Sequence, residues 1–525
     1  MSFLSEVARS LPGLRTSQSE ADRVLYARDL WPRQHLAVRS GNVAPAKASA
    51  IVWPESTSEV AKLVALARRT GTPLVPFGAG SGVCGGILPN EETVIVDLKR
   101  MTRTRSLDGA NQRVTVEAGA MGLPFEESLN AAGYTLGHFP SSIVCSTVGG
   151  WVAGRSAGQC SSLYGKIEDM VIDVECVLGT GEVMTIRNGD DGSSLVPLVV
   201  GSEGTLGIIT ATTLRIHAAP TDRIFASYTF PSTEAGFVAL RTLMQAGLRP
   251  AVARLYDPFD AMLARRGSVR KEPDASDSES HGPKAHTPGL GAKFLRNALR
   301  SARSVNGLID KLGATAFGPA LLVLVFEGDR KEEVAADASH AHALLTRVGG
   351  DDAGEGPARK WFEHRYTVSY RQAPVFEDGL FSDTFEVASP WSRLPELYDG
   401  VRKALGETAF VMSHFSHAYP DGCCIYFSFA GTTIRTEGGG WDEGCEERYD
   451  RTWRAGLAAA VAAGGTIAHH HGVGRSKAPL LTRELPGALE TFRTLKRVFD
   501  PDGILNPGNL EAHDETFLPR TRHFV

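Results

Sequence analysis

Three consecutive histidines, His469, His470 and His471, stand in the segment Ala-His-His-His-Gly-Val-Gly-Arg. Imidazole is the side chain that most readily exchanges protons near neutral pH. Consecutive residues of a strand or helix point in different directions, so a polar triplet is poor core material. The alternatives are a metal-binding tract, a solvated loop or an expression tag, although a tag belongs at a terminus and this triplet is internal. We therefore expect a functional site, with Gly472 and Gly474 letting the backbone approach another group closely.

Glycine-rich loops are the second feature that indicates ligand chemistry. Gly80-x-Gly82-x-x-Gly85 matches the dinucleotide fingerprint and follows a predicted strand at residues 74–77. The fingerprint should also open a helix, but residues 86–90 lead into another strand. We therefore reject a Rossmann domain and predict a loop whose backbone N–H groups can hold a pyrophosphate.

The elements that position these groups are mixed helices and short strands. Strands are predicted at residues 50–53, 93–98, 114–119, 171–177 and 207–216, and a helix with a capping-type start is predicted from residue 56. Residues 266–290 are polar and poor in large apolar groups, which predicts a mobile loop. A continuous apolar strand, buried on both faces, is predicted at residues 321–326.

A basic amphipathic helix is predicted after the polar loop, with Lys293, Arg296, Arg300 and Arg303 between its apolar positions. Two interpretations stay open: a helix packed on the protein surface, and a helix that touches a membrane.

Composition restricts the class of protein. The chain has 525 residues, 42% of them hydrophobic, and a net charge of -5, as in soluble globular proteins without a nucleic acid partner. We find no apolar run long enough to span a bilayer and no signal peptide. The seven cysteines are odd in number and lack zinc-type spacing, which favours reduced thiols in a cytoplasm, with Cys145 and Cys160 as small packing residues.

Three motifs, in order, resemble those of the vanillyl-alcohol-oxidase type of flavoproteins: Pro-Phe-Gly-Ala-Gly-Ser-Gly at 76–82, Ser-Thr-Val-Gly-Gly at 146–150 and Gly-Ser-Glu-Gly-Thr-Leu-Gly-Ile-Ile at 201–209. Ordinary turns explain any one loop but explain all three badly. The first loop lacks histidine, so the resemblance implies non-covalent FAD. It implies flavin contacts from Pro76, Phe77, Gly78, Ala79, Gly80, Ser81, Gly82, Ser141, Ser146, Thr147, Gly149, Gly154, Arg155, Ser156, Ala157, Glu203, Gly204, Thr205, Leu206, Gly207, Ile208 and Ile209.

Many members of this superfamily oxidise D-2-hydroxyacids at a metal held by two histidines and a glutamate. Here His417 is kept, the second histidine is missing and His470 takes the glutamate position. Metal-assisted oxidation is therefore disfavoured and no metal is predicted, although three histidines can in principle hold zinc.

The same departures resemble the alkylglycerone-phosphate synthase family over nearly the whole length. The matching segments include Tyr-Gly-x-Ile-Glu-Asp at 164–169, Phe-Glu-Gly-Asp-Arg at 326–330, Cys-Ile-Tyr-Phe at 424–427 and the histidine triplet. The resemblance implies an α+β fold, with a two-subdomain FAD-binding domain and a cap domain of antiparallel sheet and covering helices. The expected ranges are 1–45 for a helical lead-in, 46–220 for the FAD-binding domain, 221–440 for the substrate (cap) domain and 441–525 for a region that returns to the FAD domain.

The family implies an alkyl transfer without net redox change. Tyr426 matches a tyrosine that takes a proton from C1 of acyl-dihydroxyacetone phosphate, before a long-chain fatty alcohol replaces the acid. A phenol titrates near pH ~10, so it needs a cationic or hydrogen-bonding partner, and the triplet can supply one. Arg371, with Arg365 as the fallback, matches a phosphate-binding arginine, and Arg254 matches one between flavin and substrate tunnel. The alternatives are a strand core residue for Tyr426 and surface ion pairs for the arginines.

The prediction is therefore a flavin-dependent alkyl transferase that acts on acyl-dihydroxyacetone phosphate and a fatty alcohol. The alternatives are an FAD-dependent oxidase or dehydrogenase of a D-2-hydroxyacid, and a non-catalytic flavin-binding scaffold. We also predict a cytoplasmic homodimer. It is expected to associate peripherally with a membrane surface, because both substrates carry long alkyl chains.

Overall fold

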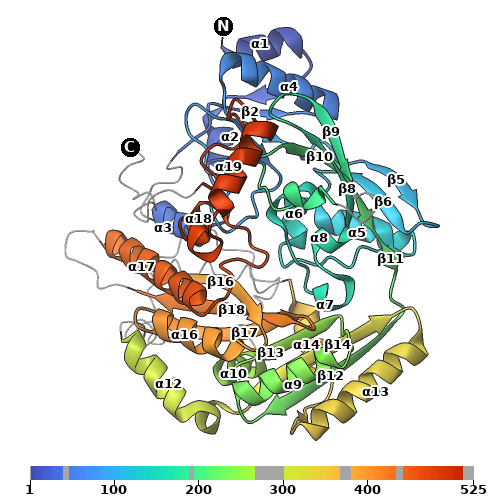
Figure 1. Ribbon diagram of the computed structural model, residues 1–525, viewed down its shortest axis with the longest axis vertical. Helices are drawn as coiled ribbons and strands as arrows, with labels where there is room; N and C mark the ends of the chain where they lie inside the picture. The colour runs from blue at the N-terminus through green and yellow to red at the C-terminus, as the bar shows by residue number, and fades with distance from the viewer. Residues whose placement is uncertain are drawn as a thin grey trace, which may run out of the picture.

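The computed structural model describes residues 2–39, 46–187, 194–266, 299, 301–366, 380–432 and 441–511. Arg371, segment 267–290 and the basic residues Lys293, Arg296 and Arg300 lie outside these ranges. Within them, two smaller sheets and their helices form one half of the molecule, and a large sheet with its helices forms the other (Figure 1).

The first sheet has the order β1-β2-β4-β3, with β2, β4 and β3 parallel. Ser56 caps the start of helix α4 (Thr57–Thr70), as predicted, because its side chain accepts the N–H of Glu59. No helix follows the first glycine loop, which confirms the rejection of a Rossmann domain. The elements here are α1 (Phe3–Ser10), β1 (Arg15–Ser17), α2 (Glu20–Leu25), α3 (Pro32–Arg39), β2 (Ala50–Trp53), α4 (Thr57–Thr70), β3 (Leu74–Phe77) and β4 (Val94–Asp97).

The second sheet is antiparallel, with the order β5-β6-β10-β8-β9, and it shares a hydrophobic core with the first. Its elements are β5 (Thr104–Asp108), β6 (Arg113–Glu117), α5 (Gly122–Ala131), η1 (Ile143–Cys145), α6 (Val148–Gly154), α7 (Ser161–Tyr164), α8 (Ile167–Met170), β8 (Val171–Val177), β9 (Val183–Arg187), η2 (Val196–Leu198) and β10 (Ile208–Arg215). The short strands β7 (Tyr134–Thr135) and β11 (His217–Ala218) pair with each other.

The large sheet is antiparallel, with the order β15-β12-β14-β13-β17-β18-β16. Its strands are β12 (Asp222–Phe230), β13 (Val252–Tyr256), β14 (Ala320–Gly328), β15 (Asp351–Asp352), β16 (Phe381–Pro390), β17 (Phe410–Ala418) and β18 (Gly422–Gly431). Its helices are α9 (Thr233–Gln245), α10 (Pro258–Arg266), α12 (Ala302–Phe317), α13 (Lys331–Arg347), α14 (Gly356–His364) and α16 (Leu394–Gly406). The strand predicted at 321–326 lies in β14 and is buried throughout, as expected.

One face of this sheet packs against α9, α13, α16 and α17 (Trp441–Ala462), through a core that includes Phe385, Phe415 and Phe427. Side chains alternate between the faces of a strand, so Tyr426 points to the opposite face. On that face Cys160 of the flavin half packs beside residues of β13 and β14. The candidate site therefore lies between the two halves.

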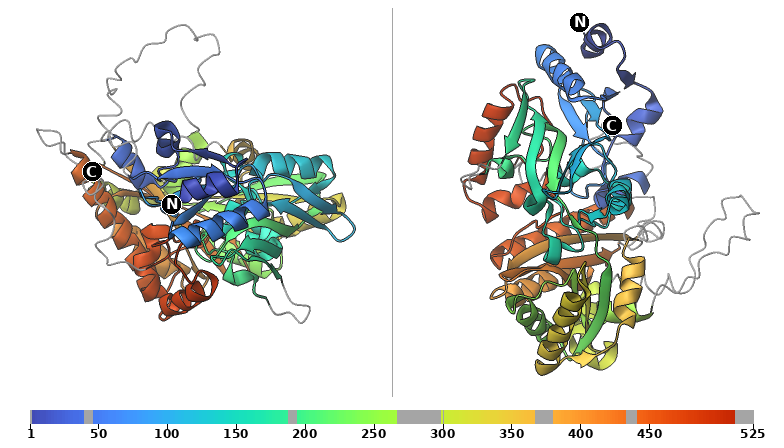
Figure 2. Two further views of the ribbon diagram at one scale, coloured as in Figure 1. Left: turned by 90° about the horizontal axis from the view of Figure 1, so that it is seen from above. Right: turned by 90° about the vertical axis from the view of Figure 1, so that its right-hand side faces the viewer.

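The chain ends by returning to the first half. The helices are α17 (Trp441–Ala462), α18 (Gly474–Glu484) and α19 (Ala488–Phe499), and α19 lies beside the upper half in Figure 1 and in the right-hand view of Figure 2. Leu74 of β3 forms a bridge with Leu505 after α19. This arrangement confirms the α+β fold with an antiparallel cap sheet, while the residue limits of the domains stay predictions.

None of the described helices is both long enough and apolar enough to cross a membrane. Arg303, the described member of the basic stripe, pairs with Glu407 on the surface at 3.2 Å.

Candidate active site

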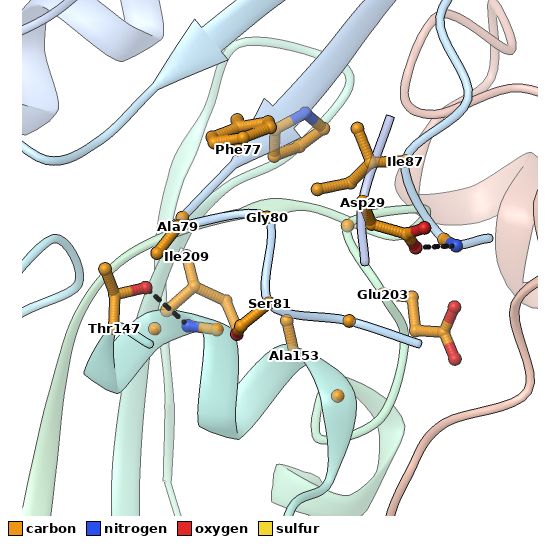
Figure 3. A pocket seen from close by; sticks show the side chains of 18 of the residues that line it. Asp29, Phe77, Ala79, Gly80, Ser81, Ile87, Thr147, Ala153, Glu203 and Ile209 are labelled. Atoms are coloured by element: carbon orange, nitrogen blue, oxygen red, sulfur yellow. Dashed lines mark hydrogen bonds between the residues drawn. The ribbon is translucent and has the colours of Figure 1, made fainter. Parts of the chain in front are cut away.

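A pocket in the upper half is lined by the predicted glycine loops (Figure 3). Loop 76–82, the start of α6 and the segment 203–209 form its walls. Gly80 has φ +68°, a conformation that favours glycine. Gly154 lines the pocket, and a Cβ atom there would meet no atom within 4 Å. Small residues with exposed backbone and the hydroxyl of Ser81 suit a dinucleotide, so the pocket fits FAD.

The predicted flavin residues divide into two groups. Those that line the pocket are Pro76, Phe77, Gly78, Ala79, Gly80, Ser81, Gly82, Thr147, Gly149, Gly154, Glu203, Gly204, Gly207 and Ile209. Those that do not are Ser141, Ser146, Arg155, Ser156, Ala157, Thr205, Leu206 and Ile208. Several of the second group serve the surrounding fold: Ser146 accepts from the Trp151 indole at 2.7 Å, and Arg155 pairs with Glu168 at 3.1 Å.

Two further residues that line the pocket, Asp29 and Asn506, do not belong to the predicted flavin motifs. Asp29 accepts the N–H of Gly86 at 3.0 Å, and burial raises its pKa to about 7. Asn506 donates to the carbonyl oxygens of Gly86 and Glu203. A lone Asp or Asn gives no periodic signal, so sequence reasoning misses both.

His471 also lines this pocket, and it connects the flavin site to the histidine triplet. His470 faces the other way and forms a short hydrogen bond from its Nε2 atom with the Tyr426 hydroxyl. His469 is linked to His470 through their Nδ1 atoms at 2.9 Å. The triplet therefore divides its members between the pocket and the tyrosine.

Two buried carboxylates hold the histidine loop. Oε1 of Glu386 accepts the N–H groups of His469, His470 and His471 at 3.1, 2.9 and 2.6 Å. Its other oxygen accepts from the fully buried Lys477 at 2.7 Å. Burial alone would raise the pKa of Glu386, but the neighbouring Lys477 ammonium holds it well below its usual range. Glu386 therefore stays charged and fixes the backbone of all three histidines.

The second carboxylate is Glu203, which comes from the flavin half. Its Oε1 accepts the N–H groups of Val473 and Gly474 at 2.7 and 3.1 Å, at the start of α18. Burial raises the pKa of Glu203, and its oxygen accepts N–H groups that a helix N-terminus leaves unsatisfied. Gly472 has φ +80°, and a Cβ there would lie 2.7 Å from Glu203. Gly472 therefore approaches the Glu203 carboxylate, whereas Gly474 approaches Cys84, whose carbonyl oxygen would overlap with a Cβ atom there.

The Tyr426 and histidine rings are neutral in the resting site. Burial raises the pKa of Tyr426 well above 10, and it lowers that of His470 well below 6.5. Burial also lowers the pKa of His469 to about 4. Two roles are expected for the triplet, a cationic one and a hydrogen-bonding one. The lowered pKa values of the histidines favour the hydrogen-bonding role.

Arg254 lies on the same face of the sheet as Tyr426. Its Nη2 donates to Nε2 of His414 at 2.6 Å, and the His414 ring stacks on Tyr426 with centroids 4.7 Å apart. Its Nε is buried and has no partner among the described residues. Arg365 donates to the carbonyl oxygen of Phe362 at 2.6 Å and stacks on that ring.

One group of possible metal ligands also lies here. Single ligand atoms of Cys424, His469 and His470 fall within 4.8 Å of one another. Burial raises the pKa of Cys424 well above its ordinary value, so its thiol is protonated and a poor ligand in this state.

Comparison with known proteins agrees with this architecture. The family model of the FAD binding domain matches residues 48–187, and that of the C-terminal domain of FAD linked oxidases matches residues 219–510. The chain is 30% identical to an alkyldihydroxyacetonephosphate synthase of Dictyostelium discoideum, over 93% of this chain and 78% of the relative. It is 29% identical to the synthase of Trypanosoma brucei brucei, over 92% and 75%.

Solved structures are also similar to this chain over most of its length. An alkyldihydroxyacetonephosphate synthase structure superposes with a TM-score of 0.73 at 26% identity, covering 96% of this chain and 84% of that one. A 4-ethylphenol oxidase from Gulosibacter chungangensis reaches 0.71 at 16% identity, covering 98% and 97%, which shows a shared fold only.

Non-covalent binding of FAD has a direct test. Cys84 is the described thiol that lines the pocket, and burial raises its pKa to about 12, so it is not a nucleophile. We expect the flavin of the purified protein to remain in the supernatant after acid precipitation, as measured by its absorbance. Flavin in the pellet would contradict this, and Cys84→Ala would then show whether Cys84 is the tether.

Proposed function

We propose an alkyl transfer, because this chain belongs to the alkyldihydroxyacetonephosphate synthase family. In this reaction a long-chain fatty alcohol replaces the acyl chain of acyl-dihydroxyacetone phosphate. The bond between C1 and the acyl oxygen breaks and the bond between C1 and the alcohol oxygen forms. A carboxylate leaves, the alcohol loses its proton, the proton taken from C1 during the reaction returns to C1, and no net oxidation occurs.

The Tyr426–His470 hydrogen bond carries this proposal, because it joins a phenol to a neutral imidazole next to the flavin pocket. The C1–H group lies beside a ketone, which makes its proton acidic. Tyr426 takes this proton on its oxygen while its own proton passes to Nε2 of His470. His469 shares the added positive charge through the Nδ1 contact, and the Glu386 carboxylate lies close to this loop.

FAD, when bound, would supply an electrophilic ring for this reaction, and His471 is the member of the triplet that lines its pocket. Arg254 offers an unpaired Nε donor to the substrate from the sheet side. Arg371, outside the described residues, remains the proposed phosphate ligand, with Arg365 as the alternative. A guanidinium suits a phosphate because it presents two parallel donors.

The pH dependence of the reaction follows from the neutral histidines. His470 accepts a proton only when it is neutral, which holds above its pKa, and burial places that pKa well below 6.5. We expect kcat to stay constant as the pH falls through ~6.5, where an ordinary histidine is half protonated, and to fall only in more acidic solution. An acid limb with its midpoint near 6.5 would contradict the proposal, provided that circular dichroism shows an intact fold there.

A product assay decides between this function and its main alternative. Purified holoenzyme is incubated with palmitoyl-dihydroxyacetone phosphate and hexadecanol, and the ether product is measured by mass spectrometry. Bleaching of the flavin by a D-2-hydroxyacid, without ether formation, would support the oxidase instead.

We also propose that the enzyme is cytoplasmic, forms a homodimer and binds a membrane surface peripherally. The support for the membrane contact is chemical, since both substrates carry long alkyl chains and reside in lipid. Binding to anionic vesicles, and its loss at high salt, measures this association.

A further inference from the structure

The Tyr426 hydroxyl has a second imidazole partner that the mechanism above does not use. Nε2 of His417 lies 3.3 Å from the phenol oxygen, and the His417 ring lies beside that of His470, with their centroids 4.6 Å apart. His417 is buried, with 5% of its surface exposed.

The backbone at His417 is shaped to present this ring. The pairing of β17 with β18 shifts between Ser416 and Ala418, and His417 has φ +53°. A residue other than glycine in this region costs free energy, so it persists where the surrounding structure requires it. A bulge of this type redirects a side chain, and here it directs the ring towards Tyr426.

The other nitrogen of His417 contacts the flavin half. Nδ1 lies 2.7 Å from the hydroxyl of Ser161, which is buried and belongs to α7. The Ser161 hydroxyl lies 3.2 Å from that of Tyr419. A continuous hydrogen-bonded chain therefore runs from Ser161 through His417, Tyr426 and His470 to His469.

The proposed transfer of the phenol proton to His470 gives this chain of hydrogen bonds a direction. A neutral imidazole carries one N–H and a phenol carries one O–H. If Tyr426 donates to Nε2 of His470, its oxygen must accept from Nε2–H of His417. Nδ1 of His417 is then an acceptor, and the Ser161 hydroxyl donates to it. At the far end, Nδ1–H of His470 donates to Nδ1 of His469, so every bond has one donor and one acceptor.

We propose that His417 is a further catalytic residue, which donates from Nε2 to the Tyr426 oxygen as the phenol proton moves to His470, and that Ser161 is a positioning residue that fixes the tautomer of His417. This inference rests on the proposed function.

The step is balanced. The C1 proton moves to the Tyr426 oxygen, the phenol proton moves to Nε2 of His470, and the electron pair of the C1–H bond passes to the neighbouring ketone. His417 keeps its proton and stabilises the negative charge that develops on the phenol oxygen.

Kinetics of matched variants test the role of His417. His417→Phe keeps a planar ring without the donor, and we expect kcat to fall by about 10²–10³-fold, as for loss of one donor to a developing oxyanion, with KM little changed. His417→Gln places an amide N–H near the Nε2 position, and we expect it to retain a larger part of kcat. With substrate deuterated at C1, the isotope effect on kcat should increase in His417→Phe, because proton transfer then limits the rate more strongly. If His417 only fills space, His417→Gln should not retain more of kcat than His417→Phe, and the isotope effect should not increase.

The neighbouring serine provides the control. Ser162 donates to the carbonyl oxygen of Ala418 at 2.9 Å and takes no part in the series of hydrogen bonds from Ser161 to His469. We expect Ser161→Ala to lower kcat and Ser162→Ala to leave it unchanged. Equal kcat in His417→Phe, His417→Gln and Ser162→Ala would overturn the proposal.

The tautomer gives a readout that does not depend on activity. In holoenzyme labelled with ¹⁵N-histidine, the signals of His417 are assigned by their loss in His417→Gln. We expect a neutral ring with its proton on Nε2, and a shift towards the other tautomer in Ser161→Ala. A proton on Nδ1 of His417 would overturn this inference even in an active enzyme. Absence of the ether product would instead overturn the proposed function and leave the tautomer result to decide this inference.

Discussion

Tyr426→Phe is expected to lower kcat by about 10²–10⁴-fold, the usual contribution of a general acid or base. Phenylalanine keeps the ring that stacks on His414 and removes only the hydroxyl that contacts His470 and His417. The substrate C1–H group then has no oxygen to receive its proton. The Tyr426 ring does not line the flavin pocket, so the flavin content should not change.

The measurement is kcat for ether formation, together with the flavin absorbance per protein. Tyr228→Phe is a matched control, because Tyr228 is also buried and its hydroxyl lies 3.1 Å from a histidine, His342, but it belongs to the opposite face of the sheet. We expect the control to keep its activity. A Tyr426→Phe enzyme with more than about a tenth of the wild-type rate would exclude Tyr426 as the proton acceptor, since general catalysis contributes more than that.

Lys477→Met is expected to destabilise the protein by about 3–5 kcal/mol, the effect of removing one partner of a buried ion pair. Lys477 and Glu386 are both fully buried, and the lysine donates to the carboxylate at 2.7 Å. Without the ammonium, burial raises the pKa of Glu386, whose remaining donors are neutral backbone N–H groups. The same carboxylate positions all three histidines, so activity should fall with stability.

The melting temperature of the holoenzyme measures this effect. Adding Glu386→Gln to Lys477→Met removes the bare charge, and we expect the double variant to recover part of the melting temperature but not the activity. Glu333→Gln breaks the exposed pair with Arg330 and serves as the control, since exposed pairs contribute about 0–1 kcal/mol. A Lys477→Met protein as stable as this control would show that the ion pair does not hold the loop.

The two carboxylates explain how the halves of the molecule form one site. Glu386 comes from the cap sheet and Glu203 from the flavin half, and they hold successive backbone segments of the same loop. The loop therefore keeps a fixed position relative to both the tyrosine and the flavin pocket. Glu203, expected from its motif to contact flavin, lines the pocket and also caps α18.

The sequence by itself determines the features that depend on local pattern. Alternating and continuous apolar runs predict strands such as β14, and serine before an apolar repeat predicts the start of α4. Glycine loops predict the flavin pocket because only glycine allows close backbone approach and positive φ at positions such as Gly80. The imidazoles of the histidine triplet likewise indicate proton exchange by their chemical type, whereas the role of Tyr426 is predicted only from the resemblance to the family.

Only the tertiary structure decides which groups become partners and which protonation states they hold. Ser161 and His417 are 256 residues apart, and Lys477 and Glu386 are 91 apart, so no periodicity within one element relates them. Protonation depends on burial between the two halves: the same histidines titrate near ~6.5 when exposed to water. Folding withdraws them from water and makes them neutral, because a low-dielectric interior disfavours the charged ring.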